Sequence, residues 1–453
     1  MQIEKLKIVG LYGYIDKDIN FNRDLTLLVG INGSGKTSIL NILNWLLKPS
    51  IPNLCVTEFK SIQLIFKFKE IKYEITCKHN KTNFKYQIKV QNEIYNPLVV
   101  RIKTQPCDIK NDDRLRVNLI ESYTGLQPDE KEKKTWDLIS TFPNPTIIGL
   151  DRNIYAEESD RIYIEEAIRG RIVKKNVGPN ISPLERVKDI VNREYRKKRN
   201  SILHLTSNLK NHLMLSTFDG SITIESFTSG IKQKLNLAQI EAAENRVNDY
   251  FKNFEKKLVT EVEQKTITNY FDQLKEITKQ YQKDANDEKV KLLYGLNANQ
   301  FVKVNKLLKE FESFERQSNQ ALEQINTFID TLNHFLKDSA KKILFKEDTA
   351  ELSFQTLDKD GQIITEHKDV KFLSSGEQQV LILFSYIAFN SQDGQIFIID
   401  EPELSLHIKW QEDFLGQLEK ITPKATQLIL ATHSPILANK KREKALVLLP
   451  YNS

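Results

Sequence analysis

Cysteine is scarce in this chain of 453 residues, with only Cys55, Cys77 and Cys107. Three widely spaced cysteines cannot build a disulfide framework or a zinc knuckle. Long hydrophobic runs are also missing: no stretch approaches about 18 uncharged apolar residues, and the mean hydropathy is −0.44, which disfavours a membrane-spanning protein. Glu4 interrupts the apolar N-terminal segment, which therefore does not resemble a signal peptide. We expect a cytoplasmic protein.

An excess of one charge is absent as well. The 66 Lys and Arg residues nearly balance the 60 Asp and Glu residues, and a net charge of +6 decides nothing about partners. The segment 152–200 is different, because it holds thirteen basic residues against eight acidic ones. Its basic residues include Arg169, Arg171, Lys174, Lys175, Arg193, Arg196, Lys197, Lys198 and Arg199. Two interpretations stay open: a solvated helix face, or a surface for nucleic-acid phosphates or an acidic partner.

Aromatic and aliphatic residues are plentiful. With 40% hydrophobic residues, 23 Phe and 15 Tyr, the chain can bury enough apolar surface to offset its conformational entropy. Disorder of the whole chain is therefore excluded, and the length allows two or three domains.

The N-terminal part alternates apolar and polar residues as strands do. Residues 1–30 predict strands, residues 37–47 a helix, and residues 60–100 an antiparallel meander. Residues 235–345 contain no proline and place apolar residues at helical spacing, which predicts a lobe of antiparallel helices with a turn at Gly295.

Beyond residue 350 the pattern alternates again. The apolar runs 396–399 and 428–430 are separated by a predicted helix near 406–420, which is typical of a parallel sheet covered on both faces. A further strand is expected at 445–449. The predicted division is 1–100 and 346–453 as the two parts of one α/β head, 101–234 as a mixed basic insertion with the remainder of the head, and 235–345 as a helical arm.

Residues 30–37 read Gly-Ile-Asn-Gly-Ser-Gly-Lys-Thr and fit the phosphate-loop pattern G-x-x-x-x-G-K-[ST]. They follow a predicted strand and open a predicted helix, as the pattern demands. Glycines let backbone N–H groups approach phosphates, and the helix N-terminus adds a partial positive charge. Lys36 is expected to bridge the β- and γ-phosphates, and Thr37 to offer its hydroxyl to Mg²⁺.

Three further motifs follow in the C-terminal part. Asp400 and Glu401 end an apolar strand, where paired acids are costly unless a cation or a reaction uses them; Asp400 suits the Mg²⁺ shell and Glu401 a general base. The segment 373–379, Leu-Ser-Ser-Gly-Glu-Gln-Gln, opens a helix with serine and glycine, as an anion site can. His433 ends the last buried run, at the ligand-binding edge of such a sheet.

In this order, the four motifs resemble an ATP-binding-cassette (ABC) ATPase: Walker A at 30–37, signature at 373–377, Walker B at 396–401 and a switch histidine at 433. The wide gap between the first two is similar to the SMC, RecF and OLD branch, in which a helical arm splits the nucleotide domain. The wording at 400–407, Asp-Glu-Pro-Glu-Leu-Ser-Leu-His, and at 431–435, Ala-Thr-His-Ser-Pro, resembles OLD-like ATPases of anti-phage systems.

The resemblance implies a role for each motif residue. The nucleotide-binding residues of the loop are Gly30, Ile31, Asn32, Gly33, Ser34, Gly35, Lys36, Thr37 and Ser38. Ser374 and Gly376 would reach the γ-phosphate of a second chain in a head-to-tail dimer, residues 402–407 would form the D-loop, and His433 would sense the γ-phosphate. Thr37 and Asp400 would hold Mg²⁺, and Glu401 and His433 would be catalytic. No glutamine could be assigned to the Q-loop.

Only twenty residues follow His433, which leaves no room for the TOPRIM nuclease domain of fused OLD nucleases. The resemblance therefore implies a separate effector, a TOPRIM-type or HNH nuclease, as for the ATPase subunits of the PARIS and Septu systems. Two alternatives stay open: a RecF-like repair ATPase that binds DNA through 152–200, and a nucleotide-dependent assembly scaffold with little hydrolysis.

Overall fold

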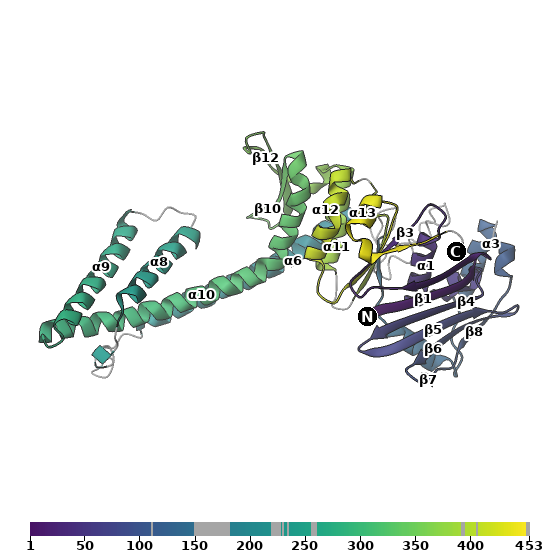
Figure 1. Ribbon diagram of the computed structural model, residues 1–453, viewed down its shortest axis with the longest axis horizontal. Coiled ribbons are helices and arrows are strands. Elements are labelled where there is room, and N and C mark those ends of the chain that lie inside the picture. The colour runs from purple at the N-terminus through teal and green to yellow at the C-terminus, as the bar shows by residue number, and fades with distance from the viewer. Residues whose placement is uncertain are drawn as a thin grey trace. The chain divides into compact units, whose positions relative to one another are not determined.

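The computed structural model describes residues 1–109, 112–148, 182–218, 228, 231–232, 235–254, 261–390, 395–404 and 406–449 (Figure 1). The chain forms two compact units. The first combines residues 1–194 with residues 325–453, and the second comprises residues 195–324.

An antiparallel sheet of seven strands forms one layer of the first unit. Its strands are β1 (Gln2–Leu11), β2 (Ile15–Asn20), β4 (Ser61–Phe68), β5 (Ile71–His79), β6 (Asn83–Val90), β7 (Glu93–Ile94) and β8 (Leu98–Arg101). The order is β2-β1-β4-β5-β6-β7, with β8 also paired to β6. The predicted meander is confirmed, because β4, β5 and β6 pair antiparallel in chain order.

A parallel sheet of five strands forms the second layer. Its strands are β15 (Ala445–Val447), β3 (Leu25–Val29), β14 (Gln427–Thr432), β13 (Ile396–Asp400) and β9 (Thr146–Ile148), in that order. Every pairing in this sheet is parallel. The strand β3 from the N-terminal part therefore lies beside β14 from the C-terminal part, and one sheet unites both ends of the chain.

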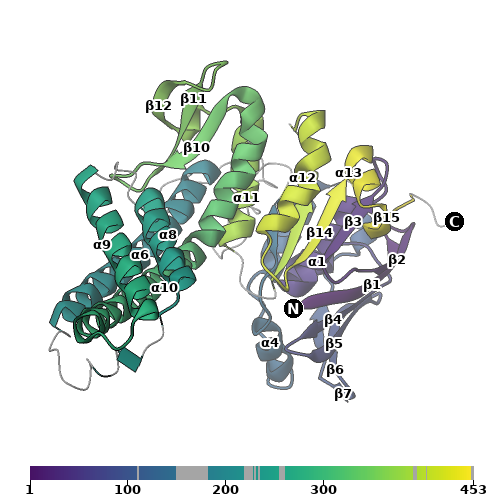
Figure 2. The same cartoon turned by 60° about the vertical axis from the view of Figure 1, so that its left-hand side comes forward.

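Helices cover both faces of the parallel sheet (Figure 2). Successive residues of β13 point to opposite faces of the sheet. Ile396 and Ile398 pack into the core that also contains residues of α1 (Lys36–Leu47) and the antiparallel sheet. Phe397 and Ile399 pack into the second core, with helices from the C-terminal part. These helices are α11 (Ser375–Phe389), α12 (Ile408–Ile421) and α13 (Pro435–Lys440). Burial on both faces explains why these strands read as continuous apolar runs.

Smaller elements complete the first unit. They are α2 (Ile51–Val56), η1 (Pro106–Ile109), α3 (Asp113–Tyr123), α4 (Lys133–Ser140), η2 (Lys337–Ser339), η3 (Val370–Phe372), η4 (Arg442–Lys444) and the antiparallel sheet of β10 (Lys341–Phe345), β11 (Leu352–Leu357) and β12 (Ile363–Asp369). Asp358 accepts backbone N–H bonds in the turn before β12, where Gly361 has φ of 78°.

The second unit is helical. The described helices that lie in or extend into it include α6 (Pro183–Phe218), α8 (Leu237–Phe254), α9 (Glu261–Lys283) and α10 (Glu288–Leu336). Its core contains Phe271 and Leu274 of α9 with Phe301 of α10, and Tyr281 stacks on Tyr294 with ring centroids 4.0 Å apart. The α/β fold with an antiparallel meander and a helical insertion is the one predicted for an ABC-type phosphate-loop domain.

The structure corrects two details of the predicted arm. Gly295 does not form a turn, because it lies inside α10; the chain reverses before α10, where Asp284 and Asp287 accept backbone N–H bonds from Asn286 and Lys289. Aspartate at such positions competes with helix continuation, and that signal outweighs a single glycine. Residues 341–345, predicted as arm, form strand β10. Residues 183–200, for which a solvated helix face was one of two interpretations, lie in α6. Among the described residues, no helix combines the length and apolarity needed to cross a membrane.

Candidate active site

The phosphate loop connects β3 to α1. Gly33 and Gly35 have φ values of 81° and 88°, in the left-handed region that favours glycine. A side chain at Gly30 would place its Cβ 2.6 Å from the carbonyl oxygen of Leu448, so that position is closed to larger residues. Ile31, Asn32 and Gly33 are exposed, Ser34 is buried, and Ser38 is half-buried in the first turn of α1. The loop is therefore open to solvent above a packed base.

The side chain of Lys36 folds back over its own loop. Its Nζ donates hydrogen bonds to the carbonyl oxygens of Gly30 at 2.8 Å and Ile31 at 3.3 Å. Burial lowers the pKa of Lys36, and the nearby carboxylates of Glu401 and Asp400 oppose that shift. Backbone carbonyl groups thus hold the ammonium group at the loop, close to the carboxylates of Glu401 and Asp400.

Thr37 and Asp400 join the loop to the end of β13. The Thr37 hydroxyl donates a hydrogen bond of 2.8 Å to Asp400 Oδ2, although the two residues are 363 positions apart. The other oxygen, Asp400 Oδ1, is buried and has no hydrogen-bond partner within the described part of the chain. Burial raises the pKa of Asp400, and the hydrogen bond from Thr37 opposes that effect. A buried carboxylate oxygen of this kind is an oxygen ligand that a cation would satisfy.

Glu401 and His433 lie next to each other at the carboxyl edge of the parallel sheet. His433 Nε2 is 3.3 Å from Glu401 Oε1, and His433 Nδ1 is 3.4 Å from Lys36 Nζ. An ammonium group can only donate, so Nδ1 is the acceptor and the neutral ring carries its proton on Nε2, toward Glu401. The backbone of Glu401 is left-handed, with φ of 49°, and its N–H donates to the Ala431 carbonyl at 2.8 Å. A constrained backbone thus aims this carboxylate.

Glu403 has a structural role in the site that was not predicted from the sequence. Its Oε1 accepts hydrogen bonds from the backbone N–H groups of His433 at 2.6 Å and Ser434 at 3.0 Å. The Ser434 hydroxyl in turn donates to Gln411 at 2.7 Å. The buried Glu403 carboxylate thereby fixes the turn that carries the histidine. The sequence places this acid in the run Asp-Glu-Pro-Glu, which the motif comparison assigns only to the D-loop. Residue 405 of the D-loop lies outside the described residues.

The signature residues lie elsewhere on the first unit. Ser374 is exposed and caps α11, and its backbone N–H donates to Glu377 Oε2 at 2.7 Å. Glu377 is almost fully buried, and its carboxylate also accepts from Lys341 and Ser339. In the described part of the chain, the hydrogen bonds and ion pairs of the loop residues and of Asp400, Glu401 and His433 do not include Ser374 or Gly376. The structure thus brings together five predicted site residues and leaves the signature apart.

Comparisons with known proteins find ATPases. The AAA ATPase domain family matches residues 1–438. The "Retron Ec83 probable ATPase" of Escherichia coli is 27% identical over 224 residues, which is 43% of this chain and 40% of that protein. The "Retron Vc95 probable ATPase" of Vibrio cholerae serotype O1 biovar El Tor is 28% identical over 148 residues, 30% of this chain and 28% of that protein. The matches therefore span less than half of either relative.

Among solved structures, the Smc head domain of Pyrococcus furiosus, bound to the C-terminal domain of ScpA, aligns with a TM-score of 0.32 and 12% identity over 97% of this chain and 91% of that one. The family match covers nearly the whole chain, and the chain is an ATPase that belongs to the AAA ATPase domain family.

Proposed function

We propose that the loop residues and the residues at the ends of β13 and β14 form one ATP-hydrolysing site. The observation that carries this proposal is the hydrogen bond from Thr37 to Asp400, which joins a phosphate loop to a buried acid. In this site Lys36 leaves its loop carbonyls to bind the β- and γ-phosphates, and the backbone N–H groups of 30–38 surround them. Thr37 and Asp400 hold Mg²⁺, which neutralises phosphate charge when bound.

Glu401 then acts as the general base. Its carboxylate lies 3.3 Å from His433 Nε2, at the edge of the sheet where the phosphate loop begins, and there it would accept the proton of a water that attacks the γ-phosphate. His433 stands between Glu401 and Lys36, within hydrogen-bond reach of both. It is thus placed to orient the base and to contact the γ-phosphate once Lys36 has turned toward it.

We infer that a second copy of the chain completes the site. Ser374 is exposed, and among the described residues it makes no hydrogen bond to the phosphate loop of its own chain, so we infer that its hydroxyl meets another chain's nucleotide. Apolar side chains around these motifs are exposed: Ile31 of the loop, Phe372 before the signature, and Leu404 and Ile408 around the D-loop. Closure of two chains over ATP would remove these groups from water.

The biological role that we propose is control of a separate effector, a TOPRIM-type or HNH nuclease, in bacterial anti-phage defence. Support comes from the wording of 400–407 and 431–435, which resembles OLD-like defence ATPases, and from the two relatives named as probable ATPases of retrons. The more specific resemblance to the PARIS or Septu ATPase rests on the sequence motifs alone.

A phage-challenge experiment tests this role. Cells that carry the native locus are compared with cells in which the chain has Glu401→Gln or the surface control Glu412→Gln, and the tagged chain is purified to identify what accompanies it. We expect protection with Glu412→Gln, loss of protection with Glu401→Gln, and co-purification of a nuclease. Full protection by Glu401→Gln with unchanged assembly would instead support the scaffold alternative.

One observation keeps the DNA-binding alternative in view. Arg193, Arg196 and Lys197 are exposed on α6, beside Lys198 and Arg199. The other predicted basic residues, Arg169, Arg171, Lys174 and Lys175, lie outside the described residues. Stimulation of ATP turnover by DNA, with a steep loss at higher salt, would favour a RecF-like repair ATPase.

A further inference from the structure

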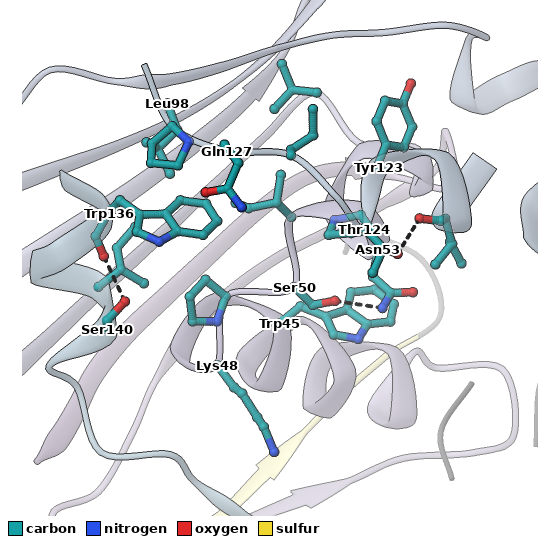
Figure 3. Close-up of a pocket in the computed structure, with 18 of the residues that line it drawn as sticks. Trp45, Lys48, Ser50, Asn53, Leu98, Tyr123, Thr124, Gln127, Trp136 and Ser140 are labelled. Carbon is teal, nitrogen blue, oxygen red and sulfur yellow. Dashed lines mark hydrogen bonds between the residues drawn. The ribbon is translucent and has the colours of Figure 1, made fainter. Parts of the chain in front are cut away.

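A cavity of about 590 Å³ lies in the first unit, away from the phosphate loop (Figure 3). Its walls come from the last turns of α1, the segment 48–53, β8, α3 and α4. This volume lies within the range of pockets that hold small organic ligands. None of the residues discussed above for ATP binding or hydrolysis lines it.

Four aromatic side chains stand among the aliphatic and polar residues that line this cavity. Trp45 of α1 and Trp136 of α4 both line it, together with Tyr123 and Phe142. Figure 3 shows the two indoles on different sides, with the amide of Gln127 between them. Trp136 keeps 36% of its surface exposed, which is a high value for so large an apolar side chain. Flat aromatic walls favour a flat ligand, because stacking contributes beyond simple burial.

The charged groups of the walls do not suit an anion. Lys48 is the one cationic residue among the described residues that line the cavity, and its ammonium group points away from Trp136 and Gln127 (Figure 3). The walls carry two carboxylates, Glu121 and Glu132, and neither is free to balance a cationic ligand. The oxygens of Glu132 accept backbone N–H bonds from Val99 at 2.9 Å and Asp129 at 3.1 Å. A phosphate would find no cation directed at it, so the ligand should be uncharged.

A buried amide adds a polar preference. Asn44 lines the cavity and is 8% exposed, and its Oδ1 accepts no hydrogen bond. This oxygen is closed off from solvent, so the Asn44 side chain must turn to meet a ligand. An N–H group of the ligand would then satisfy an acceptor whose burial is otherwise costly.

We propose that this cavity is a second ligand site that takes an uncharged planar nitrogen heterocycle of about nucleoside size and regulates the ATPase. The link to the ATPase is α1 itself. This helix of 12 residues carries Lys36 and Thr37 at its first turn and Asn44 and Trp45 near its last. A ligand that shifts the last turn of α1 shifts a rigid element whose other end carries the phosphate-binding lysine.

Tryptophan fluorescence can test the binding directly. The chain has three tryptophans, and Trp410 packs against Phe335, outside the cavity. A Trp410→Phe protein therefore reports only from the cavity, whereas a Trp45→Phe, Trp136→Phe protein reports only from Trp410. The probes are adenosine, guanosine, thymidine and caffeine, each titrated to millimolar concentration with saturating ADP present to block the nucleotide site. ATP turnover is measured with the same probes in the absence of ADP.

We expect at least one probe to quench the Trp410→Phe protein in a saturable manner and to leave the double variant unchanged. Trp136→Ala, at a half-exposed position, should weaken that binding at least about fivefold without loss of folding. The bound probe should change the turnover of the wild-type protein and not that of Trp136→Ala. Absence of saturable quenching by all four probes, or equal quenching of the double variant, would overturn the site. Binding without any change in turnover would overturn its regulatory role.

Discussion

Lys341 Nζ lies 2.8 Å from Glu377 Oε2, and this ion pair ties the strand that follows α10 to the start of α11. Glu377 also accepts from the Ser339 hydroxyl at 2.7 Å and from the backbone N–H of Ser374 at 2.7 Å. The Glu377 carboxylate therefore connects Ser374, at the start of α11, to Ser339 and Lys341, which lie in the two elements directly after α10. Loss of the pair should disturb both folding stability and the position of Ser374.

Lys341→Met should lower the free energy of unfolding by about 2–3 kcal/mol, because it leaves the buried Glu377 charge without its cation. Urea denaturation measures this change. The matched control is Lys346→Met in the segment after the same strand, whose pair with Glu351 is more exposed and should contribute less than about 1 kcal/mol. Equal losses for both variants would contradict a special role of the Glu377 pair.

The same carboxylate predicts a pH dependence. Burial tends to raise the pKa of Glu377, but hydrogen bonds from Lys341, Ser339 and the Ser374 N–H outweigh it and hold the pKa below its ordinary value of 4.5. Because the pKa of Glu377 is lower in the folded protein than in the unfolded chain, its ionised carboxylate stabilises the fold fully above pH 4.5. This contribution is lost as the pH falls through the pKa of Glu377 in the folded protein. In Lys341→Met this acid-dependent loss should shrink, as urea midpoints measured at successive pH values would reveal.

Asp400→Asn should stabilise the nucleotide-free protein while it abolishes ATP turnover. Burial raises the pKa of Asp400, so its ionised form at neutral pH costs folding energy, and the amide removes that cost. We expect a gain of about 0.5–2 kcal/mol in urea unfolding. Added Mg²⁺ and ATP should stabilise the wild type and not the variant. Asp24→Asn is the opposite control. Partial burial tends to raise the pKa of Asp24, but hydrogen bonds from Lys444 and the backbone outweigh it and lower that pKa, so loss of this carboxylate should not stabilise.

Sequence reasoning predicted most of the parallel sheet and the residues that meet at its edge, because phosphate binding restricts the loop residues and double burial leaves continuous apolar runs. It did not predict contacts between side chains that lie far apart in the sequence. Nothing in the local sequence around Lys341 indicates that it neutralises Glu377, and Glu403 reads as one more acid until His433 folds against it. A helix face was one interpretation of segment 152–200, but the extent of α6 was not predicted, because its charged surface hides the few buried positions, such as Val187 and Val191.

Glu403→Ala should slow turnover by about tenfold or more while ATP still binds, because the turn that carries His433 loses its acceptor. Glu403→Gln keeps an oxygen that can accept both N–H bonds and should recover much of the rate. Single-turnover kinetics and nucleotide affinity separate the two effects. A fall in affinity equal to the fall in rate would show a general loss of folding instead of misplacement of His433.

Glu401→Gln should bind ATP and turn over at least about 10²-fold more slowly, because the amide keeps the shape but cannot accept a proton. Glu412→Gln, an exposed change on α12, serves as the matched control and should leave the rate unchanged. A loss of less than tenfold in Glu401→Gln would point to another base.

The last prediction concerns whether two chains share each site. Ser374→Arg should leave ATP binding intact, because the loop with Lys36 belongs to the same chain, but should block closure over the γ-phosphate of a second chain. Lys36→Ala should lose ATP binding. Each variant alone should therefore be inactive.

Co-expression of the two variants with different tags then separates the possibilities. In a head-to-tail dimer, one composite site of the mixed pair carries both substitutions and the other carries neither. Turnover should return in the purified mixed dimer, to no more than about half of the wild-type rate if one intact site can act alone. Tandem affinity purification excludes the two homodimers before the rate is measured. No recovery in the verified mixed dimer would contradict independent composite sites, and recovery would place Ser374 opposite Lys36 of the neighbouring chain.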